Sequence, residues 1–344
     1  MKYKIGFPCK WIDSFEQVNG IKPLDACAKY NAKTTTVASF NRLSKTEAEA
    51  KMWVLIKHNI EAARLLVEKV GNLNEHLRMV RLGSDILPLY TLPSCRWFYS
   101  QPDVCAYIER GFAEIGRSAR FTGTRLSFHP GQFTVLASID SNIVERSIVD
   151  FEYHADMVRW MGFGQQFQDF KINVHIAGRA GPDGIRAAYP RLSPEARNCI
   201  TIENEEYAHG LDTCLELADL LPVVLDIHHH WINTGQYIHK RDERVARVIE
   251  SWRGVRPTMH YSVSREEHLP QNWPIENVPV LKTLLESGYK KGKLRAHSDS
   301  YWNSHCNRWA LSFLDDFDIM AESKGKNLSS FKLHEEFLNA QKQR

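Results

Sequence analysis

Eight short apolar runs alternate along the chain with longer segments in which apolar residues recur every three to four positions. Apolar runs of about four to eight residues that end at turn residues are typical of buried strands, and the longer spacing is typical of helices. Strands that alternate with helices predict an α/β fold built around a parallel sheet. The predicted strands are residues 3–7, 79–83, 125–128, 171–175, 199–203, 223–227, 258–261 and 317–322.

Eight strand–helix units in 344 residues favour a (β/α)8 barrel, or TIM barrel, over the alternative of an open doubly wound sheet. No GxGxxG turn follows the first strand, and polar residues follow the carboxyl ends of nearly all strands, which is the active face of a barrel. We expect a single domain over 1–344, with long loops at 90–103 and 262–294; a run at 293–297 is interpreted as loop. The predicted helices are residues 45–70, 101–119, 142–160, 210–221 and 241–252.

The composition excludes several classes of protein. The net charge is only +3, so a nucleic-acid surface must be a local patch rather than a global basic excess. The seven cysteines include no CxxC pair, which is typical of free thiols in a reducing compartment. No apolar run approaches the roughly 18 residues of a membrane span, and no targeting segment is visible. We therefore expect a cytoplasmic protein without a signal peptide or membrane contact.

Histidine and carboxylate side chains lie at the ends of six of the predicted strands. Neutral imidazoles and carboxylates are the ligands of divalent metals such as Zn²⁺ and Mn²⁺, so six such strand ends predict one site assembled from many strands. The residues are His129, His175, Glu203, Asp226 with His229, His260 and Glu322.

The individual residues differ in how strongly they indicate a metal. His129 and His175, taken alone, are equally well interpreted as ordinary histidines near turns. Glu203 closes an apolar run, where a buried carboxylate is costly unless a cation pairs with it. The Asp226–His230 run (DIHHH) is the strongest local signal, although a strand could not turn all three imidazoles inward. Because no cysteine takes part, a lone structural zinc is disfavoured, and two metals about 4 Å apart could serve an in-line displacement at phosphorus.

Nine ordered motifs give the chain a family resemblance. They are IGFPC, RLGSD with Pro88, SFHPGQF, NVHIAG, TIENEE, LDIHHH, MHYS, RAHSD and FDIMAESKGK. In these motifs the chain resembles the UV damage endonuclease family, a relative of endonuclease IV among the xylose-isomerase-like barrels. The resemblance implies a monomeric, nucleoid-associated enzyme that cuts double-stranded DNA immediately 5′ of cyclobutane dimers, 6-4 photoproducts and abasic sites. The cut would leave a 3′-hydroxyl and a 5′-phosphate, and the usual metal would be Mn²⁺, with Zn²⁺ as an alternative.

The resemblance also implies roles for particular residues. His129 and His175 would hold a first metal with Glu203, and Glu203 would bridge to a second. Of all these residues Glu203, His129 and His229 would be catalytic, and Gln132 and Phe133 would probe the helix opposite the lesion. The second metal would be held by Glu203, Asp226, His260 and Glu322, and a third by His229 and His297.

Three positions depart from the family pattern. Phe133 replaces a Tyr at the probe, which keeps the stacking ring and loses the hydroxyl. Leu92 stands where a His is frequent, and Thr258 stands where a Lys is frequent. Losing both polar groups predicts slower chemistry, an altered lesion range, or compensation by Arg295 or Lys324.

A DNA substrate also requires basic residues on the active face, and together they predict salt-dependent binding. The candidates are Arg179, Arg186 and Lys324, followed by Arg191, Lys240, Arg241 and Arg265.

Two other functions remain open at this point. Sugar isomerases and epimerases use the same kind of metal site on the same barrel, but they need neither the HPGQF probe turn nor three metals. A catalytically impaired DNA-damage binding protein would fit only if Leu92 and Thr258 have disabled the site.

Overall fold

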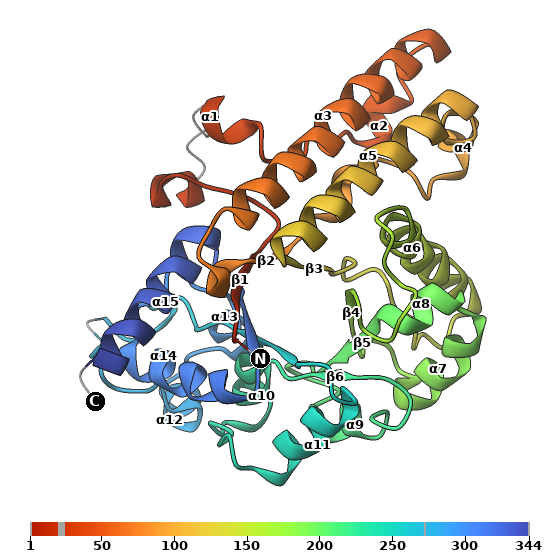
Figure 1. Ribbon diagram of the computed structural model, residues 1–344. Coiled ribbons are helices and arrows are strands. Elements are labelled where there is room, and N and C mark those ends of the chain that lie inside the picture. The colour runs from red at the N-terminus through yellow and green to blue at the C-terminus, as the bar shows by residue number, and fades with distance from the viewer. Residues whose placement is uncertain (1, 20–24, 272, 343–344) are drawn as a thin grey trace.

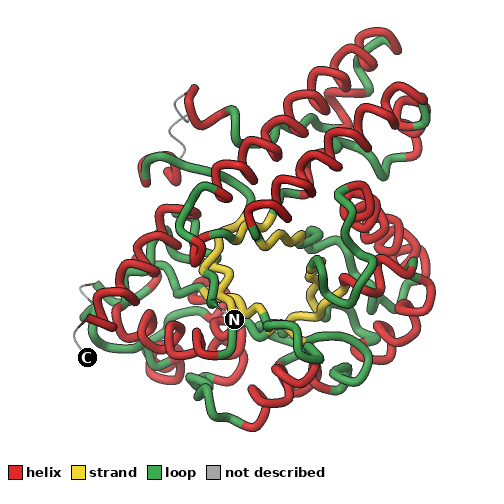
Figure 2. Tube along the Cα trace, viewed as in Figure 1, coloured by secondary structure: helices red, strands yellow, loops and turns green. Residues whose placement is uncertain are grey.

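The computed structural model describes residues 2–19, 25–271 and 273–342. Eight parallel strands form one sheet in the order β6-β5-β4-β3-β2-β1-β8-β7. The two ends of this order meet because Asp226 forms a parallel bridge with His260, and the His260 amide donates to the Leu225 carbonyl at 3.0 Å. Figure 2 shows the resulting ring of strands inside a ring of helices. The predicted (β/α)8 barrel is confirmed.

The strands of the barrel are short and almost wholly buried, as is usual for a parallel sheet covered on both faces. Three of them match the predicted ranges residue for residue, namely β3, β4 and β7. The strands are β1 (Ile5–Pro8), β2 (Met79–Arg81), β3 (Arg125–Phe128), β4 (Lys171–His175), β5 (Ile200–Glu203), β6 (Val223–Val224), β7 (Thr258–Tyr261) and β8 (Asp318–Ala321).

The helices surround the sheet. Capping follows the usual rules: the Ser44 hydroxyl accepts from the Glu47 amide and the Glu47 carboxylate accepts from the Ser44 amide, which fixes the start of the longest helix. The helices are α1 (Asp25–Ala28), α2 (Val37–Phe40), α3 (Lys45–Gly71), α4 (Arg96–Tyr99), α5 (Pro102–Thr122), α6 (Ser141–Trp160), α7 (Gly181–Ala188), α8 (Pro194–Cys199), α9 (Leu211–Leu215), α10 (Ile227–Thr234), α11 (Glu243–Ser251), α12 (Leu281–Glu286), α13 (Lys291–Leu294), α14 (Ser304–Leu311) and α15 (Lys326–Lys342).

Helices α3 and α5 lie side by side and extend well beyond the ring of strands (Figure 1). Both begin far from the barrel and end beside it. The segment 90–103, predicted as a loop, contains a 3-10 turn at Pro93–Cys95 and helix α4, and its last residues start α5. The aromatic side chains of this segment pack against the hydrophobic core. Phe98, for example, is fully buried and lies edge-on to Trp53. Leu92 packs against the same core.

The excursion 262–294 is also more ordered than a loop. It includes α12 and α13, whose apolar residues Leu281, Leu284 and Leu294 form a small second core with Trp231 of α10. Residues 293–297, interpreted as loop, lie at the end of α13 and in the loop that follows, with an isolated bridge from Ser264 to His297. Along the described ranges, no helix is both long and apolar enough to cross a membrane.

Candidate metal centre

The predicted ligands meet at the carboxyl end of the barrel. His175 ends β4, Glu203 ends β5, and His260 lies in β7. His129 and Glu322 follow directly after β3 and β8. Parallel strands bring their carboxyl ends to one face, which is why residues as far apart in the chain as His129 and Glu322 become neighbours.

Two groups of potential metal ligands share one residue. His129, His175 and Glu203 form the first, and in the second Glu203 joins three further residues. Within each group the ligand atoms lie within 4.8 Å of one another. Glu203 therefore stands between two sites in the manner of a bridging carboxylate. The second group consists of Glu203, Asp226, His260 and Glu322.

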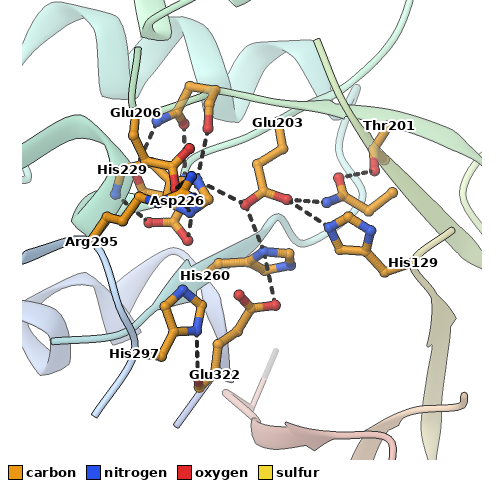
Figure 3. Close-up of polar contacts among 12 residues, drawn as sticks. His129, Thr201, Glu203, Glu206, Asp226, His229, His260, Arg295, His297 and Glu322 are labelled. Carbon is orange, nitrogen blue, oxygen red and sulfur yellow. Dashed lines mark hydrogen bonds and ion pairs between the residues drawn. The ribbon is translucent and has the colours of Figure 1, made fainter. Parts of the chain in front are cut away.

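Several atoms of this cluster are buried without a hydrogen-bond partner in the structure. They include Oδ2 of Asp226 and Nδ1 of His175; Oε1 of Glu203 and Nδ1 of His260 lie 3.1 Å apart as an ion-pair contact and form no hydrogen bond. Figure 3 shows Glu203, Asp226, His260 and Glu322 pointing toward one another around a common centre. Buried polar atoms without partners are costly, and bound cations would supply the missing partners. The acidic and histidine residues gathered here thus fit divalent metals.

Backbone carbonyls hold several of the imidazoles in a metal-binding orientation. Nδ1 of His129 lies 3.0 Å from the Pro130 carbonyl, and Nδ1 of His297 lies 2.8 Å from the Glu322 carbonyl. Nδ1 of His229 lies 2.9 Å from the Asn204 carbonyl. A carbonyl can only accept, so each of these Nδ1 atoms donates and leaves Nε2 as the atom that could coordinate a metal. Nε2 of His129 lies 3.2 Å from Oε2 of Glu203.

Asp226 begins a helix rather than continuing a strand. Its carboxylate accepts from the His229 amide at 2.7 Å, which makes Asp226 the N-cap of α10. The predicted strand 223–227 is therefore wrong beyond Val224, because a side-chain cap competes with the sheet. On a helix the three histidines point in different directions: only His229 faces Glu203, with 3.3 Å between Nδ1 and Oε1. The ring of His228 stacks on Trp231 instead.

The electrostatics of the cluster show an excess of buried negative charge. Burial, aided by the charges of Glu203 and Glu322, raises the pKa of Asp226 well above its usual range. Burial opposes protonation of His229, but the surrounding carboxylates outweigh it and raise the pKa of that imidazole to about 9. Burial lowers the pKa of His129 to about 4, so that imidazole is neutral and ready to coordinate. Divalent cations would balance the carboxylates that raise the pKa of His229.

The barrel interior beneath the cluster holds polar residues that the sequence analysis did not select. The Lys171 amine lies 3.1 Å from Nε2 of His260, and burial lowers the pKa of Lys171 to about 7. The Asn173 amide donates to Glu203 and accepts from the Thr201 hydroxyl. Period-two alternation places Lys171, Asn173 and His175 on one face of β4, so this signal was present in the sequence. The family resemblance places a lysine at position 258, where this chain has Thr258. In the structure the amine beside the cluster belongs to Lys171 instead.

Comparison with known proteins shows the family of this chain. Residues 19–343 match the family model described as UV-endonuclease UvdE. The chain belongs to the UV-endonuclease UvdE family. It is 27% identical over 315 residues to the UV DNA damage endonuclease of Bacillus cereus strain G9842, covering 89% of each chain. It is 28% identical over 246 residues to that of Bacillus velezensis, covering 69% of this chain and 73% of the relative.

Solved structures share the fold of this UvdE-family chain. The crystal structure of SacUVDE matches with a TM-score of 0.71 at 22% identity, covering 98% of this chain and 99% of the other. Endonuclease IV from Thermus thermophilus matches with a TM-score of 0.51 at 13% identity, covering 81% of this chain and 94% of the other. The family resemblance inferred from the ordered motifs is confirmed.

His229 and His297, the predicted third site of this family member, belong to neither of the two ligand groups, although Nδ1 of His229 lies 3.3 Å from Glu203. Their ring centroids lie 6.3 Å apart, and Nε2 of His229 lies 3.6 Å from the carboxylate of Glu206. Arg295 also reaches Glu206, at 3.6 Å (Figure 3). A third metal here remains a prediction, and Glu206 is an additional carboxylate within reach of it.

The predicted probe residues lie on an exposed turn after β3. The Phe133 side chain is 80% exposed, and Gln132 is also exposed. A Cβ at position 131 would lie 2.8 Å from a carbon of the Phe133 ring, so a larger residue than Gly131 would require the ring to turn. A large apolar ring held in solvent beside a metal centre is available for contact with a partner.

The basic candidates are dispersed. Arg179 is exposed on the loop after β4, and Lys324 follows β8, 3.7 Å from Asp299, which Arg265 approaches at 3.6 Å. Arg186, in contrast, makes two hydrogen bonds to Asp219 across the outer helices. Arg191 pairs with Glu145 and Lys240 with Asp315, while Arg241 is exposed before α11. A role for each in DNA binding stays a prediction.

Proposed function

We propose that this chain incises double-stranded DNA immediately 5′ of UV photoproducts and abasic sites, leaving a 3′-hydroxyl and a 5′-phosphate, with two or three Mn²⁺ ions. The observation that carries the proposal is Glu203, shared by two groups of ligand atoms at the open end of the barrel. Membership of the UvdE family and the names of the relatives, UV DNA damage endonuclease, support the substrate class.

The residues present would divide the metals as the ligand groups do. His129, His175 and Glu203 would hold one ion, and His229 with His297 a third. When bound, such ions polarise a water molecule and neutralise charge on phosphoryl oxygens. Imidazoles with carboxylates suit Mn²⁺ and Zn²⁺ alike, so manganese rests on the family resemblance. The remaining ion would lie among Glu203, Asp226, His260 and Glu322.

The chain's own contribution is to fix these ligands before substrate arrives. The side-chain amide of Asn173 donates a hydrogen bond to Glu203, and Arg81 forms an ion pair with Glu322. Glu203 is fully buried, so its carboxylate has little freedom to turn away. Ligands fixed in this way need no reorganisation during the reaction, which favours an in-line displacement at phosphorus.

The decisive experiment for this proposal is a nicking assay on UV-irradiated supercoiled plasmid. We expect the protein with Mn²⁺ to relax irradiated plasmid, to leave unirradiated plasmid intact, and to lose activity with a chelator. End-labelled oligonucleotides with one dimer would then locate the cut. Equal nicking of both plasmids, or turnover of a ketose sugar without nicking, would refute the proposal, and selective binding without nicking would indicate an impaired enzyme.

Replacing Phe133 should weaken lesion recognition without harming the fold. Stacking of a base on an aromatic side chain contributes about 1–3 kcal/mol, so Phe133→Ala should bind irradiated duplex roughly tenfold more weakly. Since the ring is 80% exposed, the free energy of unfolding should change by less than about 0.5 kcal/mol. Fluorescence anisotropy and thermal melting measure the two quantities. Phe133→Tyr is the control that keeps the ring, and an unchanged affinity for Phe133→Ala would exclude the probe role.

A further inference from the structure

Tyr207 is an exposed aromatic residue beside the metal centre. It lies four residues after Glu203, in the loop that joins β5 to α9, and its side chain is 51% exposed. The side-chain amide of Asn233 in α10 donates to the Tyr207 carbonyl at 3.2 Å. This hydrogen bond connects the loop to the helix that carries His229. Neither the ligand groups nor the probe turn uses Tyr207.

Two cations lie against the ring of Tyr207. The Lys291 amine and the Arg295 guanidinium carbon are each 5.5 Å from the ring centroid. Cations within about 6 Å of an aromatic face are attracted to it. The ring therefore limits the conformations of two long side chains, which reduces the entropy that they would lose on binding a ligand.

The positive charge around Tyr207 is concentrated and largely unbalanced. Four basic residues fall within the six positions 290–295 (KKGKLR). In the part of the chain that the structure describes, no carboxylate pairs with Lys290, Lys291 or Lys293, and Arg295 has only the 3.6 Å contact to Glu206. By contrast, many basic residues elsewhere on the surface form ion pairs, as Arg186 does with Asp219.

Helix α13 holds these cations in place. Leu294 is fully buried, and the Ser264 hydroxyl donates to its carbonyl at 2.5 Å. The Arg265 amide donates to the Ala296 carbonyl at 3.1 Å. The cations therefore stand on an anchored segment at the end of the 262–294 excursion. Arg295 contacts Glu206, which in turn lies 3.6 Å from His229 (Figure 3).

We propose that Lys291 and Arg295, held against the ring of Tyr207, bind backbone phosphates of the DNA strand that enters the metal centre. The identity of the ligand rests on the proposed function. Cations with little carboxylate pairing beside a phosphodiester-cleaving centre fit phosphate oxygens, and such contacts orient a duplex without reading its sequence. The end of the excursion 262–294, together with Arg295, thus forms one side of the DNA-binding surface.

We call Lys291, Arg295 and Tyr207 together the phosphate clamp. Binding of undamaged duplex, which is not incised, tests this clamp directly. We expect the full-length chain to bind a fluorescein-labelled duplex with an affinity that falls as salt rises. Lys291→Ala and Arg295→Ala should each lower the slope of log affinity against log salt by about one, because each removes one phosphate contact. Tyr207→Leu should weaken binding about threefold, and Tyr207→Phe, which keeps the aromatic ring, should bind like wild type.

A second cation–aromatic pair supplies the matched control. The Arg253 guanidinium carbon lies 4.7 Å from the centroid of the Phe167 ring. Both residues precede strands, so they lie at the opposite end of the barrel from the metal centre. Arg253→Ala and Phe167→Leu should leave affinity and salt slope unchanged.

The outcomes separate the clamp from the proposed function. If wild type nicks irradiated plasmid but Lys291→Ala and Arg295→Ala bind duplex with the wild-type slope and Tyr207→Leu binds with the wild-type affinity, the clamp is wrong and the function stands. If Lys291→Ala and Arg295→Ala lower the slope as expected while wild type never nicks irradiated DNA, the clamp stands and the function fails. If wild type does not bind duplex at all, both are wrong. Equal losses in the Arg253 and Phe167 variants would also overturn the clamp, because the effect would then be general charge.

Discussion

Glu203→Gln should lower the rate of incision by at least about a thousandfold. Glu203 belongs to both ligand groups, so a neutral amide at this position weakens two metal sites at once. Metals at such centres contribute several kcal/mol of transition-state stabilisation, and about 4 kcal/mol corresponds to a thousandfold change in rate. Single-turnover nicking of irradiated plasmid measures the rate, and elemental analysis of the purified variant should show a loss of bound metal.

The fold should survive this substitution. Gln has nearly the volume of Glu, and its carbonyl oxygen can still accept from Asn173. Circular dichroism should therefore match wild type, and Glu250→Gln, which changes an exposed carboxylate of α11, should keep both activity and metal. Incision by Glu203→Gln within tenfold of wild type would show that this carboxylate does not bridge two metals.

The sequence was sufficient to predict the barrel and the meeting of the strand-end residues. The reason is that both depend on short-range patterns: alternation of apolar strands with helices gives the topology, and parallel strands then bring their carboxyl ends together. β4, for example, was predicted as Lys171–His175 and has those bounds. His175 thereby lies beside Glu203, its partner across the β4–β5 pair.

Other features depended on contacts that no local pattern contains. Alternation along β4 is enough to put Lys171 on the face of His175, but the contact of its amine with His260 joins strands β4 and β7 across the barrel interior. The start of α10 at Asp226 depends on one side-chain cap, which overrides a run of strand-forming residues. The folding of 262–294 over α10 depends on a small separate core, and periodicity alone did not reveal it. These are tertiary effects, and two of them shape the candidate site itself.

Asp318 begins β8, at the end of the barrel opposite the metal centre, and replacing it should cause a large loss of stability. Its carboxylate is 2% exposed and accepts from the Lys4 amide at 2.8 Å, from Arg256 at 2.8 Å and from Arg125 at 2.7 Å. Asp318→Ala would leave two largely buried guanidinium groups without their counter-ion. Breaking a buried ion pair from one side costs about 3–5 kcal/mol. For a chain of 344 residues this corresponds to a fall in melting temperature of about 5 °C.

A neighbouring acid distinguishes this effect from a general loss of charge. The Asp315 side chain is 73% exposed in its pair with Lys240, so Asp315→Ala should change the free energy of unfolding by less than about 0.5 kcal/mol. Since Asp318 begins β8 and the metal centre lies beyond the end of that strand, Asp318→Ala should still incise irradiated DNA well below its melting temperature. Thermal melting of the two variants decides the matter. If Asp318→Ala melts within 1 °C of wild type, Arg125 and Arg256 must find other partners, and the ion cluster does not hold the barrel closed at this end.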